Sequence, residues 1–166
     1  MSRYASIGTN GPSRRTIVST AATPSTALAQ HWCALSALHD GIADHIERRL
    51  EAAHGLSVRE FSLLTVLDRQ APGRHLQMRQ VAEAVVLSQS ATTRLVTRME
   101  DRGLLQRTIC ADDRRGIYTD VTESGRKLLT DAKPTHDRAL AEALETARKN
   151  PEFTPLVEVL ERIGTE

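Results

Sequence analysis

The chain has 166 residues, of which 40% are hydrophobic and only 3% aromatic, and its formal net charge is +1. This size suits one domain with its own core, and the aliphatic composition favours packed helices over an aromatic-rich β-sandwich. Two cysteines and no secretory signal argue against a disulfide scaffold. No apolar run approaches the roughly 18 residues of a membrane span, so we expect a cytoplasmic protein without a membrane partner.

Positive charge is concentrated in two parts of the sequence. Residues 1–26 carry three arginines and no acidic residue, and residues 74–115 carry eight arginines against five acidic residues. A guanidinium group binds phosphates and base edges in a planar fork. The local arginine block therefore favours a nucleic-acid partner more than the small net charge does.

A flexible arm and a long helix are predicted first. Residues 1–26 are rich in Ser, Thr, Gly and Pro without sustained periodicity, which predicts an arm; a start codon assigned too far upstream is the alternative. Over residues 27–55, apolar residues recur at steps of three and four, as on one face of a helix. This stripe is longer than a small core needs, so we expect a dimerisation helix.

A capping box marks the start of the next helix. Ser57 and Glu60 have the required spacing, in which each side chain binds the backbone N–H of the other residue. The helix should run to about Arg69, before an Ala-Pro-Gly sequence ends it. A short extended piece over 75–77 and a short helix over 78–85 are expected to follow.

A second cap, Ser88, starts the helix that completes a helix-turn-helix, and Gly103 is expected to end it. Residues 104–110 and 116–121 are predicted strands, joined by a charged tip into a hairpin. Residues 56–122 therefore have the parts of a winged helix-turn-helix lobe, whose wing can place arginine in a minor groove.

Helices are predicted again over residues 123–166. Thr122 caps a long helix, and a last helix with several apolar residues follows Pro151. We expect these helices to complete the dimerisation region. The predicted fold class is mostly α with a small β-hairpin wing, a winged helix-turn-helix with long N- and C-terminal dimerisation helices.

The helix after Ser88 has two chemically different faces. The face expected to be buried comprises Leu87, Ala91, Leu95 and Met99, with Thr92 and Val96 beside them. The other face carries hydroxyl, amide and guanidinium groups, which can bind phosphates or base edges in a major groove. The residues expected to contact DNA are Ser88, Gln89, Ser90, Thr93, Arg94 and Arg98. A solvated helix face is the alternative for this helix alone, and the adjoining helix, turn and hairpin favour DNA binding.

Two stretches resemble motifs of the MarR (multiple antibiotic resistance regulator) family. Its recognition helix resembles LSQSATTRLVTRMEDRGL at 87–104. Its wing and the start of its next helix resemble DRRG at 113–116 followed by VTESG at 121–125. Both motifs occur at the right separation, and the similarity extends over roughly residues 28–165.

The resemblance implies a transcriptional regulator that binds double-stranded DNA at a palindromic operator as a homodimer. Members usually act as repressors that are released by a small ligand or by oxidation. In the wing, the resemblance implies that Asp113 orients an arginine and that Arg115 reaches the minor groove. We count Arg114 with them among the DNA-contacting residues.

Cys33 lies roughly where the organic-hydroperoxide-sensing branch of the family has its reactive cysteine. That branch supports its cysteine with tyrosines, and this chain has none next to Cys33. We therefore expect Cys33 to be buried and inert, with thiol-based redox sensing as the alternative. Cys110, beside the wing, is expected to be an incidental exposed thiol.

A ligand cleft is expected between the first helix and the lobe, because the family often binds phenolic or other anionic aromatic molecules there. Its candidate lining residues are Trp32, His39 and Arg69. Urate is not expected, because Ser62 follows Glu60-Phe61 where the urate-responsive branch typically has Asp after Glu-Trp.

The remaining chemistry-bearing residues give no strong motif. The six histidines form no i,i+4 pair and accompany no Cys-x-x-Cys, so no metal site is expected. No P-loop, Gly-x-Ser-x-Gly or dinucleotide fingerprint occurs, which argues against an enzyme and against a cofactor. A winged helix used only for protein contacts remains the alternative to a DNA-binding regulator.

Overall fold

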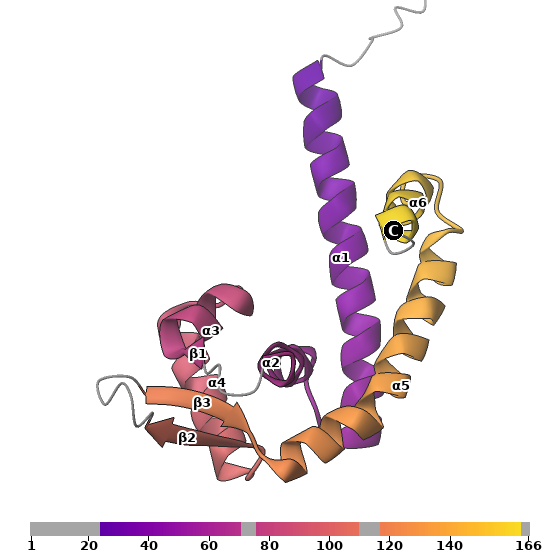
Figure 1. Ribbon diagram of the computed structural model, residues 1–166. Coiled ribbons are helices and arrows are strands. Elements are labelled where there is room, and N and C mark those ends of the chain that lie inside the picture. The colour runs from indigo at the N-terminus through magenta and orange to yellow at the C-terminus, as the bar shows by residue number, and fades with distance from the viewer. Residues whose placement is uncertain (1–23, 71–75, 110–116, 164–166) are drawn as a thin grey trace, which may run out of the picture.

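The computed structural model describes residues 24–70, 76–109 and 117–163. Its elements are α1 Pro24–His54, α2 Val58–Asp68, β1 Leu76–Gln77, α3 Met78–Ala84, α4 Gln89–Asp101, β2 Leu105–Ile109, β3 Ile117–Val121, α5 Glu123–Ala147 and α6 Thr154–Ile163. Figure 1 shows α2, α3, α4 and the strands gathered in a lobe, from which α1 and α5 rise as an arm. The mostly α fold with a small β-hairpin is confirmed.

The long first helix is confirmed, but it begins at Pro24, before the predicted start at residue 27. Proline is well tolerated in the first turn of a helix, where the missing N–H has no helical partner. The helix ends before Gly55, whose φ of 60° strains any residue with a side chain. The predicted arm over residues 1–26 therefore overlaps α1, and residues 1–23 lie outside the described part of the chain.

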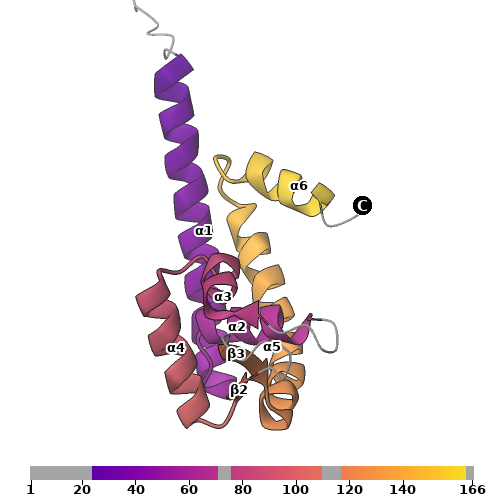
Figure 2. The ribbon, with the colours of Figure 1, turned by 60° about the vertical axis from the view of Figure 1, so that its left-hand side comes forward.

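The two halves of α1 have different surroundings. The C-terminal half runs beside α5, and Ile46 and Leu50 are buried there in the main core together with Ala139. The N-terminal half extends beyond the lobe in both views (Figures 1 and 2). A smaller apolar cluster, formed by Leu38, Ala147 and Val157, joins the middle of α1 to α5 and α6.

The lobe is built around a three-stranded antiparallel sheet in the order β1-β3-β2. In the predicted hairpin, Leu105 of β2 pairs with Val121 of β3. The extended piece predicted before α3 is a short strand of the same sheet, in which Leu76 pairs with Thr119. The helix-turn-helix packs against this sheet and α2.

The connection from the sheet to α5 is tight. Thr122 caps α5 as predicted, because its Oγ1 accepts the backbone N–H of Gly125 at 3.0 Å. A Cβ on Gly125 would stand 2.2 Å from the carbonyl oxygen of Leu104, so only glycine fits here. Further along, α5 contains Pro134, and a proline inside a helix accounts for the curvature that carries α5 from the lobe to α1 (Figure 1).

Large apolar side chains are exposed near the end of the arm. On α1, the exposed fractions are 71% for Leu28 and 67% for Trp32. On α6, Val159, Leu160 and Ile163 are also exposed. Scattered exposed leucines are ordinary, but a group of this kind marks an interaction surface. Among the described residues, no helix combines the length and the apolar character that a bilayer span requires.

Candidate nucleic-acid interface

α4 is oriented by its cap and by its apolar stripe. The Ser88 hydroxyl accepts the backbone N–H of Ala91, which starts the helix at the predicted position. The residues of α4 that are buried against the lobe are Thr92, Leu95, Val96 and Met99. Ala91 is half-buried, so this face of the helix is turned toward the core.

The opposite face of α4 is polar and exposed, and Figure 2 shows the helix at an outer edge of the lobe. The exposed residues are Gln89, Ser90, Thr93, Arg94, Thr97 and Arg98. The Thr93 hydroxyl donates to the Gln89 carbonyl oxygen at 2.9 Å, and the hydroxyls of Ser88 and Ser90 lie 3.3 Å apart. Within the described chain, Arg94 forms no hydrogen bond or ion pair, which leaves its guanidinium available to a ligand.

Arg98 has a different environment from Arg94. Its Nε donates to Glu60 Oε1 at 3.1 Å, and Arg102 Nη1 lies at the same distance from that oxygen. The Glu60 side chain is only 5% exposed, and its second oxygen accepts the Ser57 N–H. Burial opposes the charge of this carboxyl, but the Ser57 hydrogen bond and the two arginines outweigh it and lower the pKa of Glu60.

The capping box that the sequence predicts for Ser57 and Glu60 is confirmed. The ion pairs of Glu60 with Arg98 and Arg102 were not predicted, because they join residues about 40 positions apart in the sequence. The available signal was the spacing of Arg98 and Arg102, which places two guanidinium groups on one side of a helix.

A further arginine attaches the hairpin to α4. Arg107 of β2 donates to the Thr97 hydroxyl at 3.1 Å and pairs with Glu100 at 3.0 Å. The hairpin and α4 thus share polar contacts beside the exposed face. The predicted tip residues Asp113, Arg114 and Arg115, like Cys110, lie outside the described residues.

The predicted ligand-pocket residues are only partly brought together. Trp32 and His39 line one surface groove, all of whose lining residues belong to α1. Arg69 follows α2 as its C-terminal cap residue and does not line that groove.

The expectation that Cys33 is buried is wrong, because Cys33 is exposed. It lies on an open groove of about 940 Å³, whose other wall includes Pro155 and Leu156. The N-terminal half of α1 extends past the lobe, and the described part of the chain leaves the thiol exposed. In the described part of the chain, no group of three or more His, Cys, Asp or Glu residues is placed to hold a metal ion.

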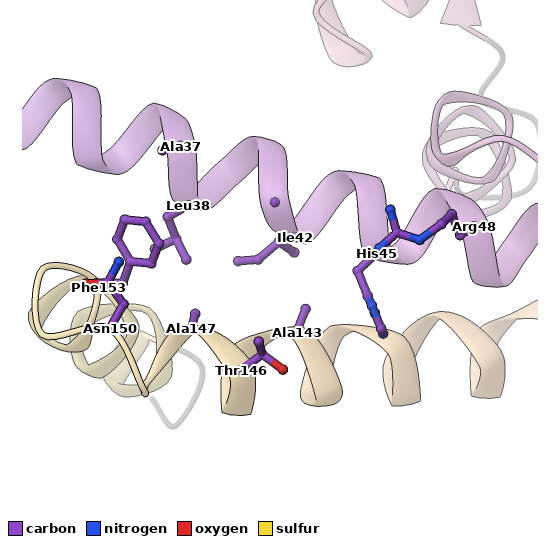
Figure 3. Close-up of a pocket in the computed structure, with 11 residues that line it drawn as sticks. Ala37, Leu38, Ile42, His45, Arg48, Ala143, Thr146, Ala147, Asn150 and Phe153 are labelled. Carbon is purple, nitrogen blue, oxygen red and sulfur yellow. The ribbon is translucent and has the colours of Figure 1, made fainter.

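A cavity of about 250 Å³ lies between α1 and α5 (Figure 3). Its walls are mainly apolar, with Leu38 and Ile42 on one side and Ala143 and Ala147 on the other, and Phe153 lies at one end. His45 and Arg48 lie toward the other end. His45 is held by Glu142, whose Oε2 is 3.0 Å from the His45 Nε2.

The comparisons with known proteins agree with this geometry. A model of the MarR family matches residues 54–116, which include the helix-turn-helix. The chain is 28% identical to the HTH-type transcriptional regulator MhqR of Bacillus subtilis over 130 residues, 78% of this chain and 86% of MhqR.

Solved structures of similar proteins align with this chain over most of its length and over most of their own. Sco3205, a MarR family transcriptional regulator from Streptomyces coelicolor solved in complex with DNA, is 27% identical with a TM-score of 0.67, over 87% of this chain and 88% of its own. CouR from Rhodococcus jostii RHA1, solved bound to p-coumaroyl-CoA, is 31% identical with a TM-score of 0.60, over 79% and 85%. As predicted, the relatives are regulators rather than enzymes. The chain therefore belongs to the MarR family of DNA-binding transcriptional regulators.

Proposed function

We propose that this chain is a homodimeric repressor that binds a palindromic operator through α4 and the wing. The observation that carries the proposal is the exposed polar face of α4, in which the unpaired Arg94 stands among hydroxyl and amide groups within the described chain. Arginine in a major groove binds guanine through two hydrogen bonds. The similarity to Sco3205, whose structure contains DNA, supports the same use of the fold.

Selection of bound duplexes from a random pool tests the operator. We expect a palindrome, and Arg94→Ala should weaken binding to it by about 1–3 kcal/mol if Arg94 makes a bidentate base contact. Arg138→Ala, which removes an exposed arginine from α5, is the matched control and should bind as the wild type does. A pool without enrichment, or equal losses in the two variants, would contradict the proposal.

The homodimer is supported by the exposed apolar residues at the end of the arm. Four large apolar side chains are exposed there, those of Leu28 and Trp32 on α1 and of Leu160 and Ile163 on α6. A group of exposed apolar side chains is typical of a surface that packs against a partner. We expect sedimentation to give a dimer. Leu160→Glu should dissociate it, while Lys149→Glu, a charge change on the exposed surface of the same arm, should leave it intact.

Release by a small ligand is the second part of the proposal. The cavity between α1 and α5 has apolar walls and a cationic end, which suits a small aromatic acid; cavities of about 150 Å³ already bind benzene. CouR, a similar protein, was solved with p-coumaroyl-CoA bound.

The test of ligand release is the dissociation of the operator complex by benzoate and by 4-hydroxybenzoate, with cyclohexanol as the uncharged control. We expect the two acids to act and Arg48→Gln to abolish their effect, since Arg48 lines the cavity. An equal response in Arg48→Gln and the wild type would place the ligand elsewhere. Repression itself is tested by a reporter gene under the selected operator, whose expression should rise when the regulator is deleted.

A further inference from the structure

A single buried carboxylate connects α4 to α2 and to the N-cap of α2. Glu60, in the first turn of α2, accepts the Ser57 N–H at 2.9 Å with one oxygen. Its other oxygen binds Arg98 of α4 and Arg102, the C-cap residue of α4, both at 3.1 Å. Arg102 also donates through Nη2 to the carbonyl oxygen of Gly55, at 2.9 Å. The junction between α1 and α2 is thereby connected to the last turns of the DNA-reading helix.

Arg98 and Arg102 differ in how far their side chains are exposed to solvent. The side chain of Arg98 is 59% exposed and that of Arg102 is 35% exposed, while the Glu60 carboxylate between them is almost fully buried. A buried carboxylate without its cations is costly, because water cannot replace them. In the free protein the charge of Glu60 therefore holds both guanidinium groups, and α4 is fixed at its C-terminal end.

Arg94 and Arg98 stand one turn apart on α4, and both are exposed. Arg98 uses its Nε to bind Glu60, whereas Arg94 has no partner within the described chain. With its Nε held by Glu60, Arg98 can offer only its two Nη groups to a ligand, and the ion pair limits where they can reach. The sequence predicts both residues as DNA contacts, but the structure gives them different surroundings.

We propose that Glu60 is a positioning residue for DNA recognition, which acts through Arg98 and Arg102 to hold α4 at the angle that the operator requires. Arg98 belongs to this support, and Arg94 is the arginine of α4 that reaches the DNA. The inference rests on DNA reading by α4, as proposed above, and adds a residue that does not contact the DNA.

Glu60→Gln is the sharpest variant, because the amide oxygen can still accept the Ser57 N–H while the charge under the arginines is lost. Operator affinity should fall about tenfold, equivalent to about 1.4 kcal/mol. Affinity for non-specific duplex should stay unchanged or rise, because the released Arg98 can bind a phosphate. In Glu60→Gln, the slope of log operator affinity against log salt concentration should stay the same or steepen by about one unit per half-site. Arg94→Gln should instead flatten this slope, because it removes a contact with the DNA.

The experiment measures operator and non-specific affinities at several salt concentrations for the full-length wild type, Glu60→Gln, Arg98→Gln, Arg94→Gln and the double variants. Circular dichroism gives the highest temperature at which each variant is still folded, and binding is measured below that temperature. We expect Glu60→Gln and Arg98→Gln to be non-additive in operator affinity, because the two residues form one ion pair. Glu60→Gln and Arg94→Gln should be additive.

A loss of affinity shared equally by operator and non-specific DNA would reduce Glu60 to a stability residue and overturn the inference. An unchanged operator affinity in Glu60→Gln, while Arg94→Gln loses binding, would overturn it as well and leave DNA reading by α4 intact. If Arg94→Gln and Glu60→Gln both bind as the wild type does, DNA reading by α4 fails first, and the positioning role fails with it.

Discussion

The phenyl ring of Phe61 stacks on the imidazole of His136, with the ring centroids 4.4 Å apart and the planes inclined by 12°. Phe61 belongs to α2, in the lobe, and His136 to α5, just after Pro134. The stack therefore joins the lobe to the arm at the place where α5 leaves the lobe.

Loss of this stack should destabilise the protein modestly. His136→Ala should lower the free energy of unfolding by about 0.5–1.5 kcal/mol, the usual contribution of an aromatic pair beyond its buried area. Urea unfolding measures the change. His39→Ala removes a histidine that is 77% exposed on α1, and a comparable loss in that control would contradict the assignment.

Gly125 should be the least replaceable glycine among those described. In Gly125→Ala the new methyl would meet the Leu104 carbonyl at 2.2 Å and a Val121 methyl at 2.8 Å, so the start of α5 must shift away from the sheet. We expect a loss of about 1–3 kcal/mol in thermal or urea unfolding, as for other overpacked sites.

The matched control is Gly41→Ala in α1, because a Cβ there meets nothing within 4 Å. Alanine is a better helix former than glycine, so this variant should gain about 0.5–1 kcal/mol. Similar effects at both glycines would show that the close contact at Gly125 does not limit the packing.

Glu60 should make the protein more stable above its pKa than below it. Burial raises the pKa of this carboxyl, but the Ser57 N–H, Arg98 and Arg102 together bring it below the ordinary value of 4.5. In that range the unfolded chain binds more protons than the folded one, so stability rises with pH. The contribution of Glu60 is complete above pH 4.5 and is lost as the pH falls through the lower pKa of the folded state.

Urea unfolding over a series of acidic pH values tests this dependence. Glu60→Gln should be less stable than the wild type above pH 4.5, and its stability should change less between that pH and the acid limit. Parallel pH profiles for the two proteins would show that Glu60 is not the titrating group.

Val86 should be a point of backbone strain. This residue lies in the turn between α3 and α4, with φ of 53° and an exposed fraction of 87%. A β-branched residue with positive φ is unusual, and the left-handed conformation costs an L-residue about 1–2 kcal/mol. Val86→Gly should therefore stabilise the lobe by about 1 kcal/mol in thermal unfolding. Val86→Ala keeps the Cβ and should gain much less; an equal gain from both would remove strain as the explanation.

The elements of the lobe could be predicted because their signals are local. Ser57, Ser88 and Thr122 each accept a backbone N–H three residues ahead, and each marks the start of a helix at its predicted place. The buried stripe of α4 could be predicted for the same reason, because Leu95 and Met99 lie one turn apart on the helix.

Long-range packing set the features that could not be predicted. Arg98 has the same sequence signature as Arg94, and only the packing of α4 against α2 brings it to the buried Glu60. Cys33 has apolar neighbours in the sequence, and although the stripe over residues 27–55 is longer than a small core needs, it does not show which of its residues the core leaves exposed. The separation of Arg69 from Trp32 and His39 likewise follows from the direction in which α1 leaves the lobe.

The position of Trp32 on the N-terminal half of α1 also determines what the tryptophan fluorescence of this protein reports. Trp32 is the one tryptophan of the chain, and its indole is 67% exposed on that half of the helix. Its emission wavelength therefore reports the polarity around the arm and is insensitive to the core of the lobe. If a second copy of the chain covers α1, as in the proposed homodimer, the emission should shift to the blue. Dilution of the protein that dissociates this dimer should shift the emission back to the red. The chain thus contains an intrinsic optical probe of its arm that requires no label.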